Sequence, residues 1–83
     1  MRIVIIEDEA VVARRIERLA RRILGAKLER VDFAATLAAA VELVERLDDA
    51  AVLLDLNLGG EDGFELLRRA AAEPFQTIVI SAN

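Results

Sequence analysis

The sequence predicts an α/β fold in which an open parallel sheet carries helices on both faces. Short apolar runs alternate along the chain with longer segments whose apolar residues recur at helical spacing. The runs at residues 3–6, 51–54 and 77–80 are continuous, which is typical of parallel strands buried on both faces. The resulting order, β-α-β-α-β-α-β, requires crossover helices between the strands. The 83 residues are enough for one such domain over residues 1–83, and they contain no linker.

The first half of the chain predicts two strands and two helices. Residues 3–6 form a β-branched run, and residues 9–24 have helical periodicity that ends at Gly25. Residues 28–33 predict a weaker strand, and Thr36 is the expected N-cap of a helix over residues 37–47. The apolar stripes expected to face the core are Val12, Ile16, Leu19 and Ile23 in the first helix and Leu37, Val41, Val44 and Leu47 in the second.

The second half repeats the pattern around a glycine-rich loop. Residues 51–54 predict a third strand that ends on Asp55, and the loop 56–63 follows it. Residues 64–72 predict a third helix, whose continuation Pro74 blocks. Residues 77–80 predict the fourth strand. The short alanine runs at 38–40 and 70–72 suit close helix packing.

The composition excludes several classes of function. The chain has no Cys and no His, which excludes a disulfide scaffold, thiolate or imidazole metal sites and imidazole catalysis. A net charge of −4 and the absence of Trp and Tyr argue against a nucleic-acid partner for this segment. No apolar run approaches the ~20 residues of a membrane span, and no secretory signal is present. We therefore expect a cytoplasmic protein without a membrane partner.

Polar side chains follow three of the predicted strands at their carboxyl ends, where parallel sheets bind their ligands. Glu7 and Asp8 follow the first strand, Asp55 ends the third, and Ser81 follows the fourth. Carboxylates that converge repel one another unless a proton or a cation holds them. Oxygen ligands without His or Cys suit Mg²⁺ or Mn²⁺. Carboxylates, a divalent cation and a hydroxyl together indicate phosphoryl transfer onto a carboxylate.

These residues, in this order, resemble the receiver domain of bacterial two-component response regulators. The resemblance rests on Glu7-Asp8 after an apolar strand, on Asp55 with the loop to Gly63, and on Ser81-Ala82 after a further strand. It covers the whole chain and implies a flavodoxin-like sheet with strand order 2-1-3-4. The family's fifth strand and last two helices have no counterpart in the predicted elements.

The resemblance also implies a role for each candidate residue. Asp55 is the implied phosphoacceptor and a Mg²⁺ ligand. Asp8 is implied to bind Mg²⁺ directly, and Glu7 to act on the cation through water. Asn57 is implied to supply a backbone carbonyl to the cation, and Ser81 to be the hydroxyl that moves toward the phosphoryl group.

The function implied is a phosphoacceptor signalling module. A sensor histidine kinase would phosphorylate Asp55, and the altered surface would act on an effector domain or a downstream protein. Such a chain is not an enzyme beyond catalysing its own phosphorylation and dephosphorylation. The lysine that grips the phosphoryl group in the family has no counterpart, because the one lysine, Lys27, lies near the second strand. An alternative is therefore a scaffold or interaction module that works without phosphorylation, or a receiver fragment. A phosphatase of the haloacid dehalogenase type is disfavoured, because its nucleophile follows the first strand.

Two surface features have open interpretations. The first helix carries a cluster of arginines that is either a basic face for nucleic acid or acidic lipid or a solvated face, and the net charge favours the second. The members of this cluster are Arg14, Arg15, Arg18, Arg21 and Arg22. The expected strand order also places the third helix opposite the first and leaves the fourth strand as an apolar edge beside a half-bare face. We therefore expect self-association through that exposed fourth strand.

Overall fold

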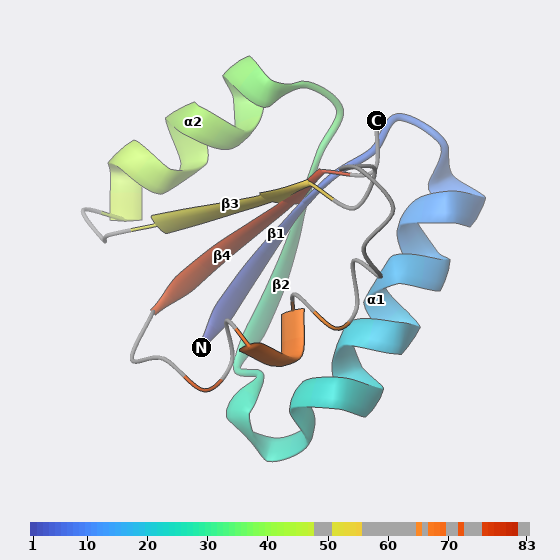
Figure 1. Ribbon diagram of the computed structural model, residues 1–83. Helices are drawn as coiled ribbons and strands as arrows, with labels where there is room; N and C mark the ends of the chain where they lie inside the picture. The colour runs from blue at the N-terminus through green and yellow to red at the C-terminus, as the bar shows by residue number, and fades with distance from the viewer. Residues whose placement is uncertain (48–50, 56–64, 66, 70–71, 73–75, 82–83) are drawn as a thin grey trace.

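A computed structural model of the chain describes residues 1–47, 51–55, 65, 67–69, 72 and 76–81 (Figure 1). Its regular elements are β1 (Arg2–Ile6), α1 (Ala10–Leu24), the 3₁₀ turn η1 (Gly25–Lys27), β2 (Arg30–Ala34), α2 (Leu37–Leu47), β3 (Ala51–Asp55) and β4 (Thr77–Ser81). Residues 65 and 67–69 are also helical, within the span expected for the third helix. The described part of the chain contains no helix that is long and apolar enough to cross a membrane.

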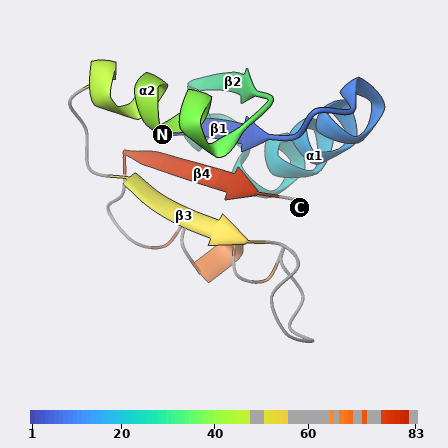
Figure 2. The same cartoon turned by 90° about the horizontal axis from the view of Figure 1, so that it is seen from above.

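The four strands form one parallel sheet with the order β2-β1-β4-β3, which Figure 2 shows from above. The predicted class, a parallel α/β sheet with helices on both faces, is confirmed. The predicted order 2-1-3-4 is wrong, because β4 rather than β3 pairs with β1. Three of the four residues at 77–80 are isoleucine or valine and the fourth is threonine, so β4 is β-branched on both faces. Such a strand favours an interior position, and β3, with fewer branched residues, takes the edge.

The expectation of an exposed fourth strand is therefore also wrong. Residues 77–80 of β4 are all buried, and the strand is paired on both sides. The edges of the sheet are β2 and β3. Self-association through a free edge at β4, as expected from the sequence, has no basis in this arrangement.

The helices divide between the two faces of the sheet (Figure 1). α1 packs on one face with Ile3, Ile5, Ile78 and Ile80, and Leu67 joins the same cluster. α2 packs on the other face over β1 and β2. The expectation that the third helix lies opposite the first is wrong at Leu67. The connection from β3 to β4 runs back in the direction of the one from β1 to β2, so a right-handed crossover returns to the face of α1.

Alanine residues contribute to the sheet-facing side of both helices. In α1 the buried positions are Ala13, Ile16, Ala20 and Leu24, so the buried face is centred one residue beyond the expected stripe. In α2 the fully buried residue is Ala40, whereas Leu37 and Val41, which were expected to face the core, are 54% and 46% exposed. The alanine at the contact lets α2 approach the sheet closely, and this approach turns its two N-terminal large residues toward solvent.

Two helix ends agree with the sequence expectations. The Thr36 hydroxyl accepts a hydrogen bond from the Ala39 amide at 3.1 Å, which is the contact of an N-cap. Gly25 ends α1 with φ of 54°, a conformation that side-chain-bearing residues rarely adopt. These two residues fix where α2 begins and where α1 turns toward β2.

Thr77→Val is expected to stabilise the fold. The Thr77 hydroxyl is buried in the sheet and has no hydrogen-bond partner among the described residues. Valine keeps the branched shape and removes an unsatisfied polar group, whose burial costs about 1–3 kcal/mol. Urea unfolding followed by circular dichroism measures the gain. Thr36→Val is the matched control, because it removes a capping hydroxyl and should lose about 1 kcal/mol. Equal effects of the two changes would show that the Thr77 hydroxyl is satisfied in solution.

Candidate functional site

The carboxyl ends of β1, β4 and β3 lie side by side. We call the end of the sheet where these strands finish the carboxyl edge; it is distinct from the outer strands β2 and β3. In the parallel register Ile6 of β1 pairs with Ser81 of β4, and Ser81 pairs with Asp55 of β3. Ser81 therefore stands between the end of β1 and Asp55. Neighbouring strands are about 4.8 Å apart, so Asp55 starts about 9.6 Å from β1 at the backbone.

Glu7 and Asp8 continue directly from the end of β1. The Glu7 amide donates to the Ala34 carbonyl at 2.9 Å, which extends the pairing with β2 by one residue. The Glu7 carboxylate oxygen Oε1 accepts the Glu9 amide at 3.1 Å, just before α1 begins. One oxygen of Glu7 is thus engaged with the start of the helix. Asp8 is exposed, and no described residue makes a hydrogen bond or an ion pair with its carboxylate.

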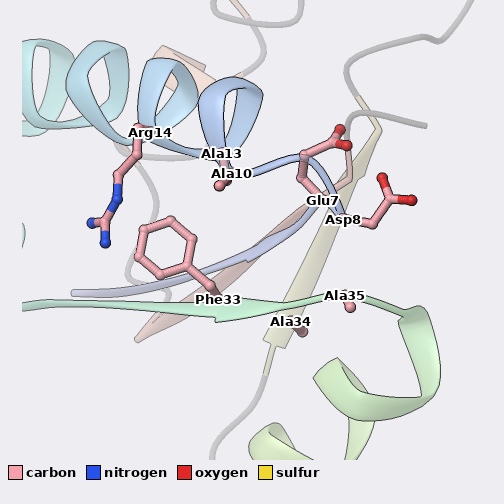
Figure 3. A pocket seen from close by; sticks show the side chains of 8 residues that line it. All are labelled: Glu7, Asp8, Ala10, Ala13, Arg14, Phe33, Ala34 and Ala35. Carbon is pink, nitrogen blue, oxygen red and sulfur yellow. The ribbon is translucent and has the colours of Figure 1, made fainter.

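A pocket of about 340 Å³ opens beside these two carboxylates, between the start of α1 and the end of β2 (Figure 3). Its small side chains come from α1, from the last residue of β2 and from the residue after it: Ala10, Ala13, Ala34 and Ala35. Glu7 and Asp8 lie at one end of it, and Arg14 and Phe33 at the other. The Arg14 guanidinium lies 4.8 Å from the centre of the Phe33 ring. The pocket thus has an acidic end and a cation–aromatic end.

The position of Arg14 is held by a second contact along α1. Its Nη1 donates to Glu17 Oε1 at 3.0 Å, and Arg21 pairs with Glu17 Oε2 at 3.0 Å. The hydrogen bond from Arg14, and then the bond and charge of Arg21, lower the pKa of Glu17 below its usual value against the opposing effect of burial. Glu17 therefore stays ionised at neutral pH and fixes two of the five arginines of the helix.

The residues singled out from the sequence divide into two groups. Glu7, Asp8, Asp55 and Ser81 all lie at the carboxyl edge of the sheet. Asn57 and the loop 56–63 lie outside the described residues. Lys27 lies in η1, and its carbonyl accepts the Met1 ammonium at 3.0 Å, so it stands at the amino end of β1 and away from the site.

The donor chemistry of this edge fits a hard divalent cation. Asp8 offers a carboxylate with no other partner in the described part of the chain, and Glu7 has one oxygen left. Asp55 approaches from β3, two strand spacings from β1. The described residues alone contain no group of three or more acidic side chains that could hold a metal ion. A cation at this edge would therefore need oxygen ligands from β3 in addition to those after β1.

The Arg14–Phe33 pair is not among the contacts predicted from the sequence. The sequence analysis places Arg14 in the arginine cluster of the first helix and Phe33 in the weaker second strand. The signal that could have indicated the pair is strand alternation, because Phe33 shares a face of β2 with Val31, which packs in the cluster under α1. An aromatic residue at such an exposed place needs a partner, and the arginine one turn into α1 supplies it.

Comparison with known families gives one match. A model of the family described as "Response regulator receiver domain" matches residues 3–83. The matched range includes the residues at the carboxyl edge and both helices. A comparison with curated proteins finds no match to the chain.

Proposed function

Because the chain belongs to the response regulator receiver domain family, which acts in two-component signal transduction, we propose that Asp55 is its phosphoacceptor. The observation that supports this most directly is the strand register. Asp55 ends β3 beside Ser81 and on the same edge as Glu7 and Asp8. A carboxylate at the carboxyl edge of a parallel sheet lies where such folds bind phosphorylated ligands.

The proposed reaction transfers a phosphoryl group to a carboxylate oxygen of Asp55. A new O–P bond forms on Asp55 as the N–P bond of a phosphohistidine, or the O–P bond of a small acyl phosphate, breaks. The leaving imidazole takes up a proton, and a leaving acetate needs none at neutral pH. The product is an acyl phosphate on the chain, and its hydrolysis returns Asp55 and inorganic phosphate.

We propose Mg²⁺ as the cofactor of this site. Asp8 and Asp55 are the proposed direct ligands, with Glu7 acting through water and Asn57 through its backbone carbonyl. Bound there, the cation would neutralise charge on the carboxylates and on the transferring oxygens. Glu7 also holds the start of α1 through the Glu9 amide, which keeps Asp8 at the edge of the sheet.

Ser81 is the proposed switch residue. It is half-buried, and the register sets it between the end of β1 and Asp55. Its hydroxyl can donate a hydrogen bond to an anionic oxygen on Asp55, and the free energy of that contact would shift the population of two surface states. The proposed partners are a sensor histidine kinase and an effector domain or downstream protein.

Acetyl phosphate and intact-mass analysis test the phosphoacceptor directly. With Mg²⁺ present we expect one phosphoryl group per chain, and none in Asp55→Asn. Asp32→Asn is the matched control, because Asp32 lies in β2, at the opposite edge of the sheet from Asp55, and pairs with Arg30. Its replacement should leave phosphorylation unchanged. Occupancy that survives Asp55→Asn would disprove the assignment.

The occupancy is expected to be lower or shorter-lived than in a receiver with an active-site lysine. Lys27 stands at the opposite end of β1 and cannot reach the phosphoryl group. A charge-assisted hydrogen bond of the missing kind contributes about 1.5–3 kcal/mol. This observation favours a second candidate function, an interaction module that works without phosphorylation. Lack of any phosphorylation in a folded chain would support that second function.

A further inference from the structure

The outer face of α1 carries one apolar residue and three arginines in a single row. Val11, Arg15, Arg18 and Arg22 follow one another at i, i+4, i+7 and i+11, and all are exposed. We call these four residues the basic stripe. Val11 is 73% exposed and begins the row at the N-terminal end of the helix. The core-facing side of α1 is formed by other residues, so the basic stripe plays no part in the fold.

The arginines of the basic stripe differ from their neighbours in having no partner in the part of the chain that the structure describes. Arg14 and Arg21 share Glu17, whose two oxygens are both occupied. Within the described residues no side chain pairs with Arg15, Arg18 or Arg22. Three positive charges therefore project together from a chain whose net charge is −4. Such segregation of charge favours association with an acidic surface.

α2 presents the complementary face. Leu37, Val41 and Glu45 follow at i, i+4 and i+8, with Glu42 beside them, and all four are exposed. We call these four residues the acidic stripe. No described residue pairs with Glu42 or Glu45, and both line a shallow hollow of about 310 Å³ together with Arg46. The exposed apolar pair of this helix thus continues directly into its free carboxylates.

The two stripes match in the order of their apolar and charged residues. Each begins with apolar residues at the N-terminal end of its helix and continues with charge toward the C-terminal end. At 1.5 Å per residue the basic stripe is about 16.5 Å long and the acidic stripe about 12 Å long. With the helices parallel, Val11 meets Leu37 and Val41, and the arginines meet Glu42 and Glu45. The antiparallel alignment would set the charges of each helix against the apolar end of the other.

Within one molecule this contact cannot form, because α1 and α2 lie on opposite faces of the sheet (Figure 1). We propose that the basic stripe of one copy docks on the acidic stripe of a second copy. The contact is heterologous, since it joins two different surfaces, so a pair of copies keeps one free stripe at each of its two ends. Such contacts build open stacks rather than closed dimers unless the rotation between copies closes a ring.

The contact should be weak and sensitive to salt. One helix against another gives an interface at the small end of the range for specific complexes, below about 1,200 Å². Exposed charges are screened beyond about 10 Å at 0.1 M ionic strength. Self-association should therefore be strongest in dilute buffer and at high protein concentration. This inference is independent of phosphorylation, because none of its residues belongs to the phosphoacceptor site.

Sedimentation equilibrium over a hundredfold concentration range tests the proposal by charge reversal. In low salt we expect the mean mass of the wild-type chain to rise continuously with concentration, and to fall to the monomer in 0.5 M NaCl. Arg15→Glu with Arg18→Glu, or Glu42→Arg with Glu45→Arg, should each weaken association at least tenfold. The fourfold variant has the same net charge of −4 as the wild type, and it should associate again.

A mixture of the two double variants is the sharpest arm of the experiment. Each variant alone carries two stripes of like charge, so only the mixture offers opposite stripes and should associate. Three results would overturn the proposal. They are a wild-type monomer at every concentration, association that neither salt nor charge reversal weakens, and a fourfold variant that stays monomeric while folded. Binding of a polyanion such as heparin by a monomeric wild type would assign the basic stripe to another partner.

Discussion

Ile80→Ala is expected to destabilise the fold by about 2–5 kcal/mol, the range for large-to-small changes in a packed core. Ile80 is fully buried, and in the register it stands between Ile5 of β1 and Leu54 of β3. The lost side chain leaves a cavity against α1, and a neighbouring strand on each side limits how far the backbone can collapse into it. Urea unfolding followed by circular dichroism measures the loss.

The control for this change is Val11→Ala, which also shortens a β-branched side chain to alanine, at a position that is 73% exposed. Substitutions at such positions change stability by about 0.5 kcal/mol or less. If Ile80→Ala lowered the free energy of unfolding no more than Val11→Ala does, β4 would lie outside the core. Amide hydrogen exchange gives an independent reading of the strand order. In an interior β4 every backbone amide donates a hydrogen bond to a neighbouring strand and should exchange slowly. In an edge strand alternate amides have no strand partner and should exchange fast.

The elements of the fold could be predicted from the sequence because their signals are local. The helix bounds follow from periodicity and from single residues such as Thr36 and Gly25. The order of the strands depends instead on which apolar run pairs with which. The third and fourth runs have similar length and hydrophobicity, and the family pattern pointed to the other order. β-branched content alone separates them, and its effect appears only when the sheet is assembled.

The face that a helix turns to the sheet is equally non-local. Periodicity places Leu37 and Val41 on a possible core stripe, but Ala40 makes the closer contact. The choice between them depends on the distance of α2 from the sheet, which its own sequence does not specify. The same reasoning applies to Arg14, whose contact with Phe33 joins residues that are 19 positions apart.

The positions of the acidic residues that follow the strands could be predicted from the sequence. Parallel strands share one carboxyl edge, so acids that follow them must lie on that edge whatever the strand order. The order nevertheless changes the site. With β4 in the interior, Ser81 lies between the acids of β1 and Asp55, rather than beyond Asp55 as the order 2-1-3-4 implies. In the backbone register Ser81 is therefore the neighbour both of Ile6, which precedes Glu7 and Asp8, and of Asp55.

Asp8→Asn is expected to lower the affinity for Mg²⁺ by more than about 100-fold, given the proposed role of Asp8 as a direct ligand. Loss of an outer-shell partner alone typically lowers metal affinity by about 10–100-fold, and loss of a ligating carboxylate should exceed that. The fold should be unaffected, because the described residues make no hydrogen bond or ion pair with the Asp8 carboxylate that the change would break. Amide shifts of residues 7–9 during a Mg²⁺ titration followed by NMR measure the affinity.

Glu7→Gln separates direct from indirect coordination. The amide oxygen of glutamine can still accept the Glu9 amide, so the start of α1 should be preserved. Only the charge is lost, and for a residue that acts through water we expect a decrease of about 10-fold to 100-fold. Glu9→Gln is the control for net charge alone, since the Glu9 side chain makes no capping hydrogen bond. Its effect should be the smallest of the three. If the three changes weaken Mg²⁺ binding equally, the cation responds only to the general negative potential of this edge, and Asp8 is not its ligand.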